Sequence, residues 1–377
     1  MARLVGAVLL LTAACGGQAA VVASPSASPI AAYTSEPSPS PSPAPTASET
    51  PPPPTPAPTP PPLIRALRDL GPGETLRLLS EFHIPRSGFA VAMAFSPVQP
   101  VLYHTGVGLE IQGYDFEAGR VALQIKGFQQ GAPLVLAVAA AGDQIVAEDG
   151  PTLGIWDLAT AERIGSLQMP SIFAPFNGGF VGEGLFYADD ESGNLAVWDA
   201  ASWEELARLT YRGRSDGSFV LPDDQMVAML IRGSREIRIV DWSGLPVRAV
   251  PLAAEPWRLL GVSPAGEMAA LHVDVDLGTE GILITDLGEA GTAVRIPLLN
   301  VRATAISPDW RTLAVVDGDE VLRLIDTATG AQLYSQRLDA LQVRGLAFSQ
   351  DGSLLSVYEL RENEAGGFIQ IWGRGLP

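Results

Sequence analysis

The sequence predicts an all-β fold in which seven repeated units close into a ring, a seven-bladed β-propeller. Three observations predict it: short alternating apolar runs between Gly, Pro and Asp turns, a repeat of blade length, and chain ends that complement each other. In each unit an apolar or alternating run ends at one position, usually aspartate, before a turn of small residues. The equivalent positions are Asp115, Asp157, Asp199, Asp241, Asp286, Asp326 and Gly373, at intervals of 42, 42, 42, 45, 40 and 47 residues. Intervals of about 40–45 residues are typical of propeller blades.

A second repeated element begins each unit. It is clearest as AFSP at 94–97, GVSP at 261–264, AISP at 305–308 and AFSQ at 347–350. Proline, glycine and serine at these positions favour a tight turn between two strands. Each unit therefore contains an inner strand, a turn, a buried strand, a loop, a strand ending in aspartate, a turn and a half-buried strand. In the sixth unit we predict strands at 301–307, 311–317, 320–326 and 332–338.

The two ends of the repeat array complement each other. The last unit ends at Ile371–Gly373 and lacks a fourth strand, whereas Thr75–Ile84 forms a spare strand ahead of the first unit. Pairing of these segments completes the seventh blade and leaves no long unpaired edge. The predicted propeller domain therefore spans residues 63–377.

The repeats resemble the WD-repeat and related YVTN-like propeller families over roughly residues 75–377. The resemblance is carried by Trp156-Asp157, Trp198-Asp199 and Trp372, with turns at Ser263, Ser307 and Ser349. No unit contains the Gly-His dipeptide of the eukaryotic WD pattern, so the hydrogen-bond tetrad of that family cannot form. The resemblance implies the fold and a binding role, but it names no partner because a fold does not fix a function.

Residues 1–14 are predicted to be a lipoprotein signal peptide. Arg3 precedes the apolar run Leu4–Leu11, which is too short to span a bilayer, and small residues follow it. The pattern resembles a bacterial lipobox, with Thr12 where leucine is usual. That resemblance implies that Cys15, the single cysteine, carries the lipid. The alternative is an ordinary secretory signal that is cut near Ala14.

Residues 15–62 are predicted to be a disordered tether. From Ser24 to Pro62 the sequence is almost entirely Pro, Ser, Thr and Ala, which cannot bury enough apolar surface to fold. Its prolines favour extended polyproline II. We therefore expect a stalk that holds the propeller away from the extracytoplasmic face of a membrane, either the cell membrane or an outer membrane.

Charge and motifs limit the function classes. The formal net charge is −18, which argues against binding nucleic acid or anionic lipid. The sequence contains no nucleophile elbow, P-loop, HExxH or GxGxxG motif. The histidines His83, His104 and His272 fall on separate predicted strands. We therefore predict a non-enzymatic module that binds a protein partner, with no cofactor and no metal centre.

Carboxylates cluster in the predicted loops between the second and third strands of the blades. In a four-stranded blade these loops emerge on one rim, together with the links between blades. The candidate partner-binding residues are Asp189, Asp190, Glu191, Asp274, Asp276, Glu280, Asp317, Asp319 and Glu320. Such a rim either keeps the protein soluble or attracts a basic partner or divalent cations.

Two other functions stay open from the sequence. One is a propeller enzyme, quinoprotein-like or a hydrolase, with an active site at the mouth of the central channel. The other is an envelope-assembly or sensor lipoprotein. Converging carboxylates, histidines or a metal at the channel mouth would favour the enzyme, and a partner complex would favour the assembly role.

Overall fold

The computed structural model describes residues 67–70, 74–85, 92–105, 110–128, 133, 135–169, 175–190, 192–211, 213–221, 225–276, 279–288, 293–298, 300–362 and 364–374. The predicted signal peptide and tether lie outside these residues. In the described part of the chain, a short 3₁₀ helix, η1 (Leu67–Asp69), precedes 28 β-strands. No helix among the described residues is long and apolar enough to cross a bilayer.

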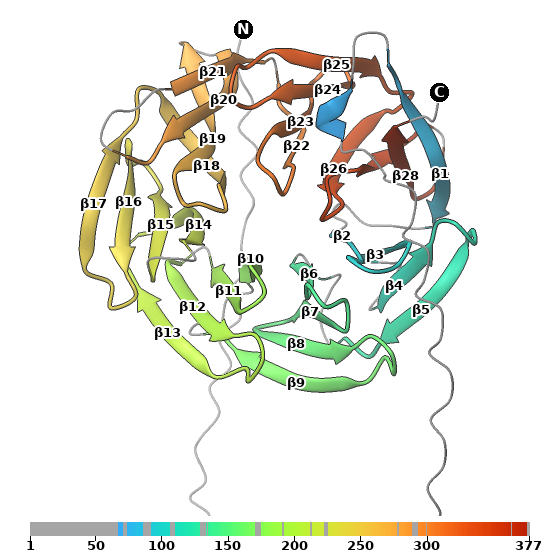
Figure 1. Cartoon of the computed structure of the whole chain (residues 1–377), viewed down its shortest axis with the longest axis horizontal. Helices are drawn as coiled ribbons and strands as arrows, with labels where there is room; N and C mark the ends of the chain where they lie inside the picture. Colours follow the sequence, from blue (N-terminus) through green and yellow to red (C-terminus); the bar gives the residue numbers. More distant parts are fainter. Residues whose placement is uncertain are drawn as a thin grey trace, which may run out of the picture. The chain divides into compact units, whose positions relative to one another are not determined.

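The strands form seven four-stranded antiparallel sheets around a common centre (Figure 1). The first blade contains β2 (Met93–Phe95), β3 (Val101–Thr105), β4 (Glu110–Asp115) and β5 (Arg120–Lys126). The second contains β6 (Leu136–Val138), β7 (Gln144–Asp149), β8 (Thr152–Asp157) and β9 (Arg163–Gln168). The third contains β10 (Pro175–Val181), β11 (Leu185–Asp190), β12 (Asn194–Asp199) and β13 (Glu205–Thr210).

The remaining blades continue in the same order. The fourth contains β14 (Ser215–Leu221), β15 (Met226–Ile231), β16 (Glu236–Asp241) and β17 (Pro246–Pro251). The fifth contains β18 (Glu255–Val262), β19 (Met268–Asp276), β20 (Thr279–Asp286) and β21 (Ala293–Pro297). The sixth contains β22 (Ala303–Ile306), β23 (Thr312–Val316), β24 (Val321–Asp326) and β25 (Gln332–Arg337). The seventh contains β26 (Gln342–Phe348), β27 (Leu354–Leu360), β28 (Gly367–Arg374) and β1 (Leu76–Ile84). The predicted seven-bladed propeller is confirmed, and the sixth-unit strands fall within one or two residues of the predicted ends.

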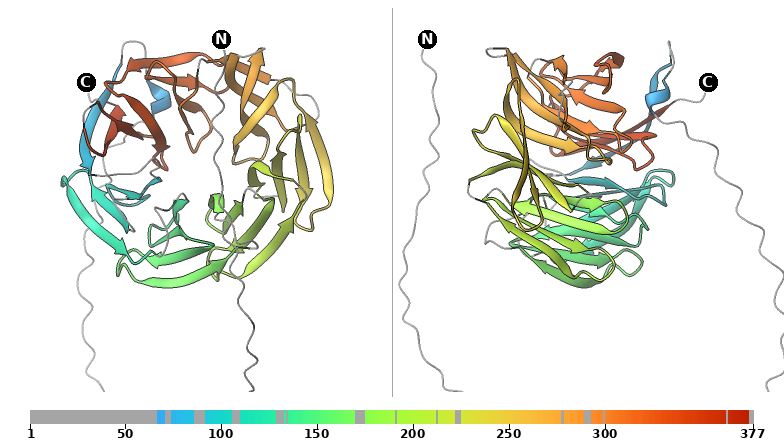
Figure 2. Two further views of the ribbon diagram at one scale, coloured as in Figure 1. Left: turned by 180° about the vertical axis from the view of Figure 1, so that it is seen from behind. Right: turned by 60° about the vertical axis from the view of Figure 1, so that its left-hand side comes forward.

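The ring is closed by the N-terminal strand, as the sequence predicts. β1 pairs antiparallel with β28 from Leu76 opposite Arg374 to Ile84 opposite Gly367. It lies on the outside of the blade formed by the end of the chain (Figures 1 and 2). The last blade therefore contains both ends of the described chain, and its outer edge is occupied.

The recurring aspartate caps the turn between the third and fourth strands of a blade. The Oδ1 atom of Asp157 accepts backbone N–H groups from Ala159 and Thr160, at 3.0 and 2.8 Å. Asp199 accepts the equivalent pair of hydrogen bonds. These bonds satisfy turn donors that the strands cannot pair, and they hold the pKa of both carboxyls below its usual range. This local requirement explains why the aspartate recurs.

The hydrophobic core lies between blades rather than inside a single one. Each of seven buried clusters combines side chains of two neighbouring blades. The cluster that spans the closure contains Ile84 of β1, Leu102 of the first blade and Tyr358 of the seventh. Since both faces of each sheet pack against a neighbour, the middle strands are apolar on both faces. Trp156 and Trp198, at equivalent positions, are buried in this packing.

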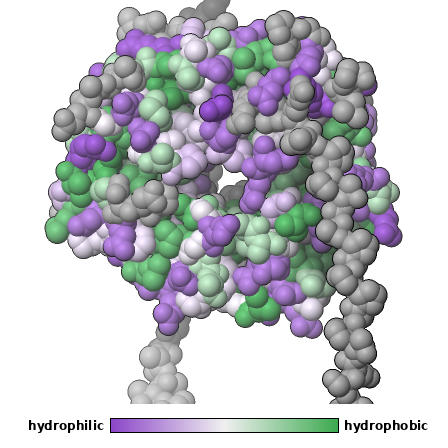
Figure 3. Space-filling view, viewed as in Figure 1, coloured by the Kyte–Doolittle hydropathy of each residue, from purple (hydrophilic) through white to green (hydrophobic). Residues whose placement is uncertain are grey.

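The topology defines two rims. The loops between the second and third strands of each blade emerge on the same rim as the connections from one blade to the inner strand of the next. This rim is here called the loop rim. The turns after inner strands and before outer strands lie on the opposite rim. The inner strands are β2, β6, β10, β14, β18, β22 and β26, and they surround a central hollow (Figure 3).

Candidate functional site

Two of the described candidate carboxylates of the loop rim, Asp190 and Asp317, are built into their own loops. Asp190 Oδ1 accepts the backbone N–H groups of Ser192 and Asn194, at 2.8 and 3.1 Å. Asp317 Oδ1 accepts those of Asp319 and Val321, at 3.0 and 3.1 Å. Both aspartates are buried. Their carboxylates therefore close the loop that follows the second strand.

Two candidate glutamates join neighbouring blades. Glu280 Oε2 accepts the backbone N–H of Val301, and Glu320 Oε2 accepts that of Val343, both at 2.9 Å. Each bond ties the third strand of one blade to the entry of the next inner strand. Burial raises the pKa of Glu320 above its ordinary value, and the bond from Val343 partly opposes this effect. Both glutamates are half-buried.

The candidate carboxylates of the loop rim differ in their exposure to solvent. Asp189, Asp190 and Asp317 are buried, because the backbone N–H groups of their loops or the packing of neighbouring side chains enclose them. Among the described candidates only Asp319 is exposed. Glu191 and the side chains of Asp274 and Asp276 lie outside the part that the structure describes. Partner binding through these residues stays a prediction.

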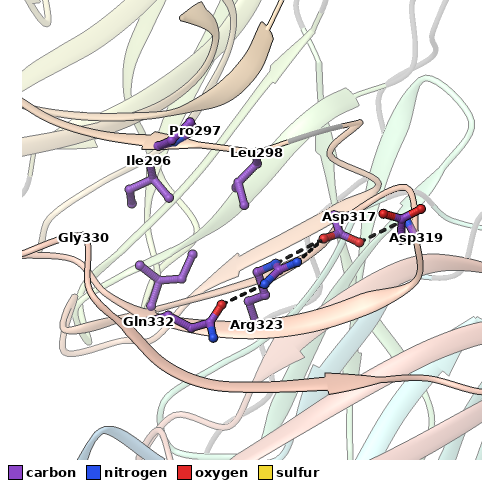
Figure 4. Close-up of a pocket in the computed structure, with 9 residues that line it drawn as sticks. Ile296, Pro297, Leu298, Asp317, Asp319, Arg323, Gly330 and Gln332 are labelled. Atoms are coloured by element: carbon purple, nitrogen blue, oxygen red, sulfur yellow. Dashed lines mark hydrogen bonds and ion pairs between the residues drawn. The ribbon is translucent and has the colours of Figure 1, made fainter.

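Asp317 and Asp319 border a groove between the fifth and sixth blades (Figure 4). Its volume is about 440 Å³, and apolar residues of β21 and β24 line it on the inner side. Arg323 crosses it, with Nη2 2.8 Å from Asp317 Oδ2 and Nη1 2.8 Å from Gln332 Oε1. Arg323 and Asp317 form an ion pair in this groove, and Asp319 adds a second carboxylate at its border.

The mouth of the channel on the loop rim is lined by charged residues that the sequence-based reasoning missed. Arg258 on β18, Arg302 just before β22 and Arg344 on β26 each stand five residues ahead of the turn serine of their blade. They line one cavity of about 260 Å³, together with His272 and Thr304. A signal for them existed, because the arginine recurs at one position in WRLLGVS, VRATAIS and VRGLAFS.

Asp189 is buried near the same mouth. Burial raises its pKa to about 8, with the neighbouring Asp190 adding to the rise, while Ser218 and Arg258 oppose it. Neither carboxylate oxygen accepts a hydrogen bond of standard geometry from the described residues. At neutral pH this carboxyl is therefore mostly protonated.

His272 lies in the arginine-lined cavity, where it contacts Trp257 and approaches Glu280. Its ring packs edge-on against Trp257 at a centroid distance of 4.9 Å, and Nε2 lies 3.6 Å from Glu280 Oε2. Burial lowers its pKa, so the ring is neutral at pH 7. His83 and His104 lie on β1 and β3, as predicted. Within the described residues, no group of three or more His, Cys, Asp or Glu side chains is placed to hold a metal ion.

Comparisons with known proteins bear on the fold alone. No protein-family model matches the chain. The search of curated proteins finds no match either. Among solved structures, the chain is similar to hydrazine synthase of Kuenenia stuttgartiensis, with 14% identity and a TM-score of 0.62, covering 76% of this chain and 95% of that one. It is also similar to the Cps50 (Swd1) β-propeller domain of Myceliophteria thermophila, with 13% identity and a TM-score of 0.61, covering 76% and 98%. A protein named as a synthase and one named only as a β-propeller domain thus share this architecture, and neither supplies a function for this chain.

Proposed function

We propose that this chain is an exported, lipid-anchored module that binds a protein partner through the loop rim of its propeller. One observation carries the proposal: the loop rim brings charged side chains of several blades to a single face around the channel mouth. Asp319 in a loop, and Arg258 and Arg302 at the mouth, are exposed there. Charged groups on one face favour rapid and selective association with a complementary partner.

The choice of rim can be tested with two substitutions in the same blade. Asp319 lies in the sixth blade on the loop rim, and Ala328 lies in the same blade on the opposite rim, in the turn before β25. Both residues are exposed. We expect Asp319→Arg to reduce capture of the partner from solubilised membranes by about ten-fold, since the substitution reverses the charge that this loop presents to the partner. Ala328→Arg should leave capture unchanged. Equal capture by the two variants would contradict binding through the loop rim.

The proposed anchor depends on Cys15 and can be tested separately. We expect the wild-type chain to incorporate labelled fatty acid and to partition into detergent, and Cys15→Ser to do neither. Thr12→Leu, which restores the usual residue of the lipobox, should retain both properties. A mature protein with a free N-terminus downstream of Cys15 would refute the anchor, because the lipid is carried by the first residue after cleavage.

A second candidate function is an enzyme with its active site at the channel mouth. The observation that favours it is Asp189, a buried carboxyl with a raised pKa close to Arg258. Perturbed pKa values are frequent at catalytic sites, but they also occur in structural networks. An activity that Asp189→Asn abolishes in a folded protein would support the enzyme over the binding module.

A further inference from the structure

Three arginines converge from three successive blades. Arg258, Arg302 and Arg344 occupy the same position relative to the turn serines Ser263, Ser307 and Ser349. Since equivalent positions of successive blades lie side by side around the channel, the three guanidinium groups come from neighbouring walls. Arg258 and Arg302 are exposed, and Arg344 is half-buried.

These arginines share one concave site. The cavity of about 260 Å³ that they line also presents Thr304, while Leu260, Val301 and Leu346 contribute apolar wall. A smaller cavity of about 160 Å³ also includes Arg258, Leu260 and Thr304 in its lining, and adds Asn177. The site is thus of a size for a small molecule rather than for a folded partner.

The charge of this site opposes that of the chain. The protein carries a formal net charge of −18, yet three guanidinium groups line a single cavity. Carboxylates lie near two of the arginines, since Asp189 and Asp216 oppose the lowering of the pKa of Arg258 by burial, and Arg302 opposes the rise of the pKa of Glu320. Among the described residues that line the cavity itself, three are arginines and none is a carboxylate.

We propose that Arg258, Arg302 and Arg344 form a binding site for a small polyanion that presents two or more carboxylate or phosphate groups. A guanidinium group matches the planar fork of a carboxylate or phosphate and can donate two parallel hydrogen bonds to it. Three such groups on adjacent walls suit a ligand with several oxyanion groups. This site does not depend on the lipid anchor, and its ligand is a small molecule rather than the protein partner proposed above.

Calorimetric titration of the purified full chain with citrate and with inorganic pyrophosphate tests the proposal. We expect at least one of them to bind and to raise the unfolding temperature. Binding of citrate alone assigns the site to polycarboxylates, and binding of pyrophosphate alone assigns it to phosphates. Binding of neither at millimolar concentration would overturn the proposal.

The site is assigned by matched arginine variants. Arg302→Gln removes one charged donor at an exposed position and is expected to weaken binding by about ten-fold or more. Arg337→Gln, an exposed arginine on the outer strand β25 of the same blade, should bind as wild type. The triple substitution of Arg258, Arg302 and Arg344 by glutamine should abolish binding while circular dichroism shows a folded chain. Unchanged affinity in Arg302→Gln, or in a folded triple variant, would place the anion elsewhere and overturn the assignment.

Discussion

Asp189→Asn is expected to remove most of the dependence of stability on pH between pH 7 and 8. The folded pKa of Asp189 is about 8, whereas an aspartate in an unfolded chain titrates near 4. Across this window the folded protein holds a proton that the unfolded chain releases. Stability therefore falls as pH rises, by up to about 1.4 kcal/mol per pH unit, and is fully present only below pH 4. Asparagine cannot ionise, so the variant loses this slope.

Urea unfolding at pH 5, 6, 7 and 8 measures the effect. Wild type should lose stability from pH 7 to pH 8, where Asp189→Asn should become the more stable protein. Below about pH 6.5 the buried His104, whose folded pKa is about 4, acts in the opposite direction and offsets the effect of Asp189. Asp319→Asn provides the control, since its side chain is exposed and should leave the slope unchanged. The aspartates that cap the turns have lowered pKa values, so their titration changes the stability only near pH 4 and below. Parallel slopes in wild type and Asp189→Asn would contradict the buried, protonated state of Asp189.

The surroundings of Asp189 explain why its charge is costly. It is fully buried, and both Tyr187 and Tyr211 have pKa values raised by burial and by the nearby Asp189 carboxyl. A second carboxylate, Asp190, lies next in the chain. Arg258 is the compensating charge, and it also lines the arginine cavity. Ionisation of Asp189 at high pH would therefore change both the stability of the third blade and the field at the channel mouth.

Deletion of β1 is expected to prevent formation of a stable ring. A chain that begins at Gly88 lacks the partner of β28 and the buried side chains of Leu76 and Ile84. It also loses the ion pair between Glu81 and Arg361, and the stacking of Phe82 on Tyr114 at a centroid distance of 3.8 Å. We expect this chain to aggregate, because the exposed edge of β28 can pair with another molecule.

A chain that begins at Leu63 is the matched control. It keeps β1 and also η1, where Leu67 is fully buried and its backbone N–H donates to the carbonyl oxygen of Gly352 at 3.0 Å. This chain should be monodisperse in size-exclusion chromatography and should melt cooperatively. Ile84→Ala within it should cost about 2–4 kcal/mol, as expected for a truncated core side chain. A soluble chain from Gly88 with the melting temperature of the control would show that β1 does not close the ring.

The repeat pattern predicted the fold because its determinants are local. The aspartate that ends the third strand in six of the blades caps a turn, and the serine that follows four of the inner strands accepts nearby backbone N–H groups, as Ser263 does from Glu267 and Met268. Requirements of this kind recur at a fixed interval and are visible without any knowledge of the tertiary structure. The spare strand at Thr75–Ile84 was predictable for a related reason, since an unpaired edge in a ring requires a partner.

The site was predicted less well, because a linear sequence does not show burial. Asp190, Asp317 and Asp319 look alike as loop carboxylates, yet the first two are enclosed by the donors of their own loops and only the third is exposed. The sequence therefore supported one acidic rim where the structure has capped loops. The recurring arginine was visible in three inner strands, but its meaning depended on where those strands meet.

The sequence by itself determined the seven-bladed architecture, the closing strand and the position of the three histidines on separate strands. Only the tertiary structure decided which charged side chains are exposed, which are buried and which lie together. Asp189 acquires its raised pKa from burial and from the neighbouring Asp190, while Ser218 of the fourth blade and Arg258 of the fifth oppose the rise. Arg258, Arg302 and Arg344, separated by more than forty residues at each step, become neighbours because the ring places equivalent positions side by side. Electrostatics depends on distance and burial in space, and neither quantity is encoded by the interval between residues.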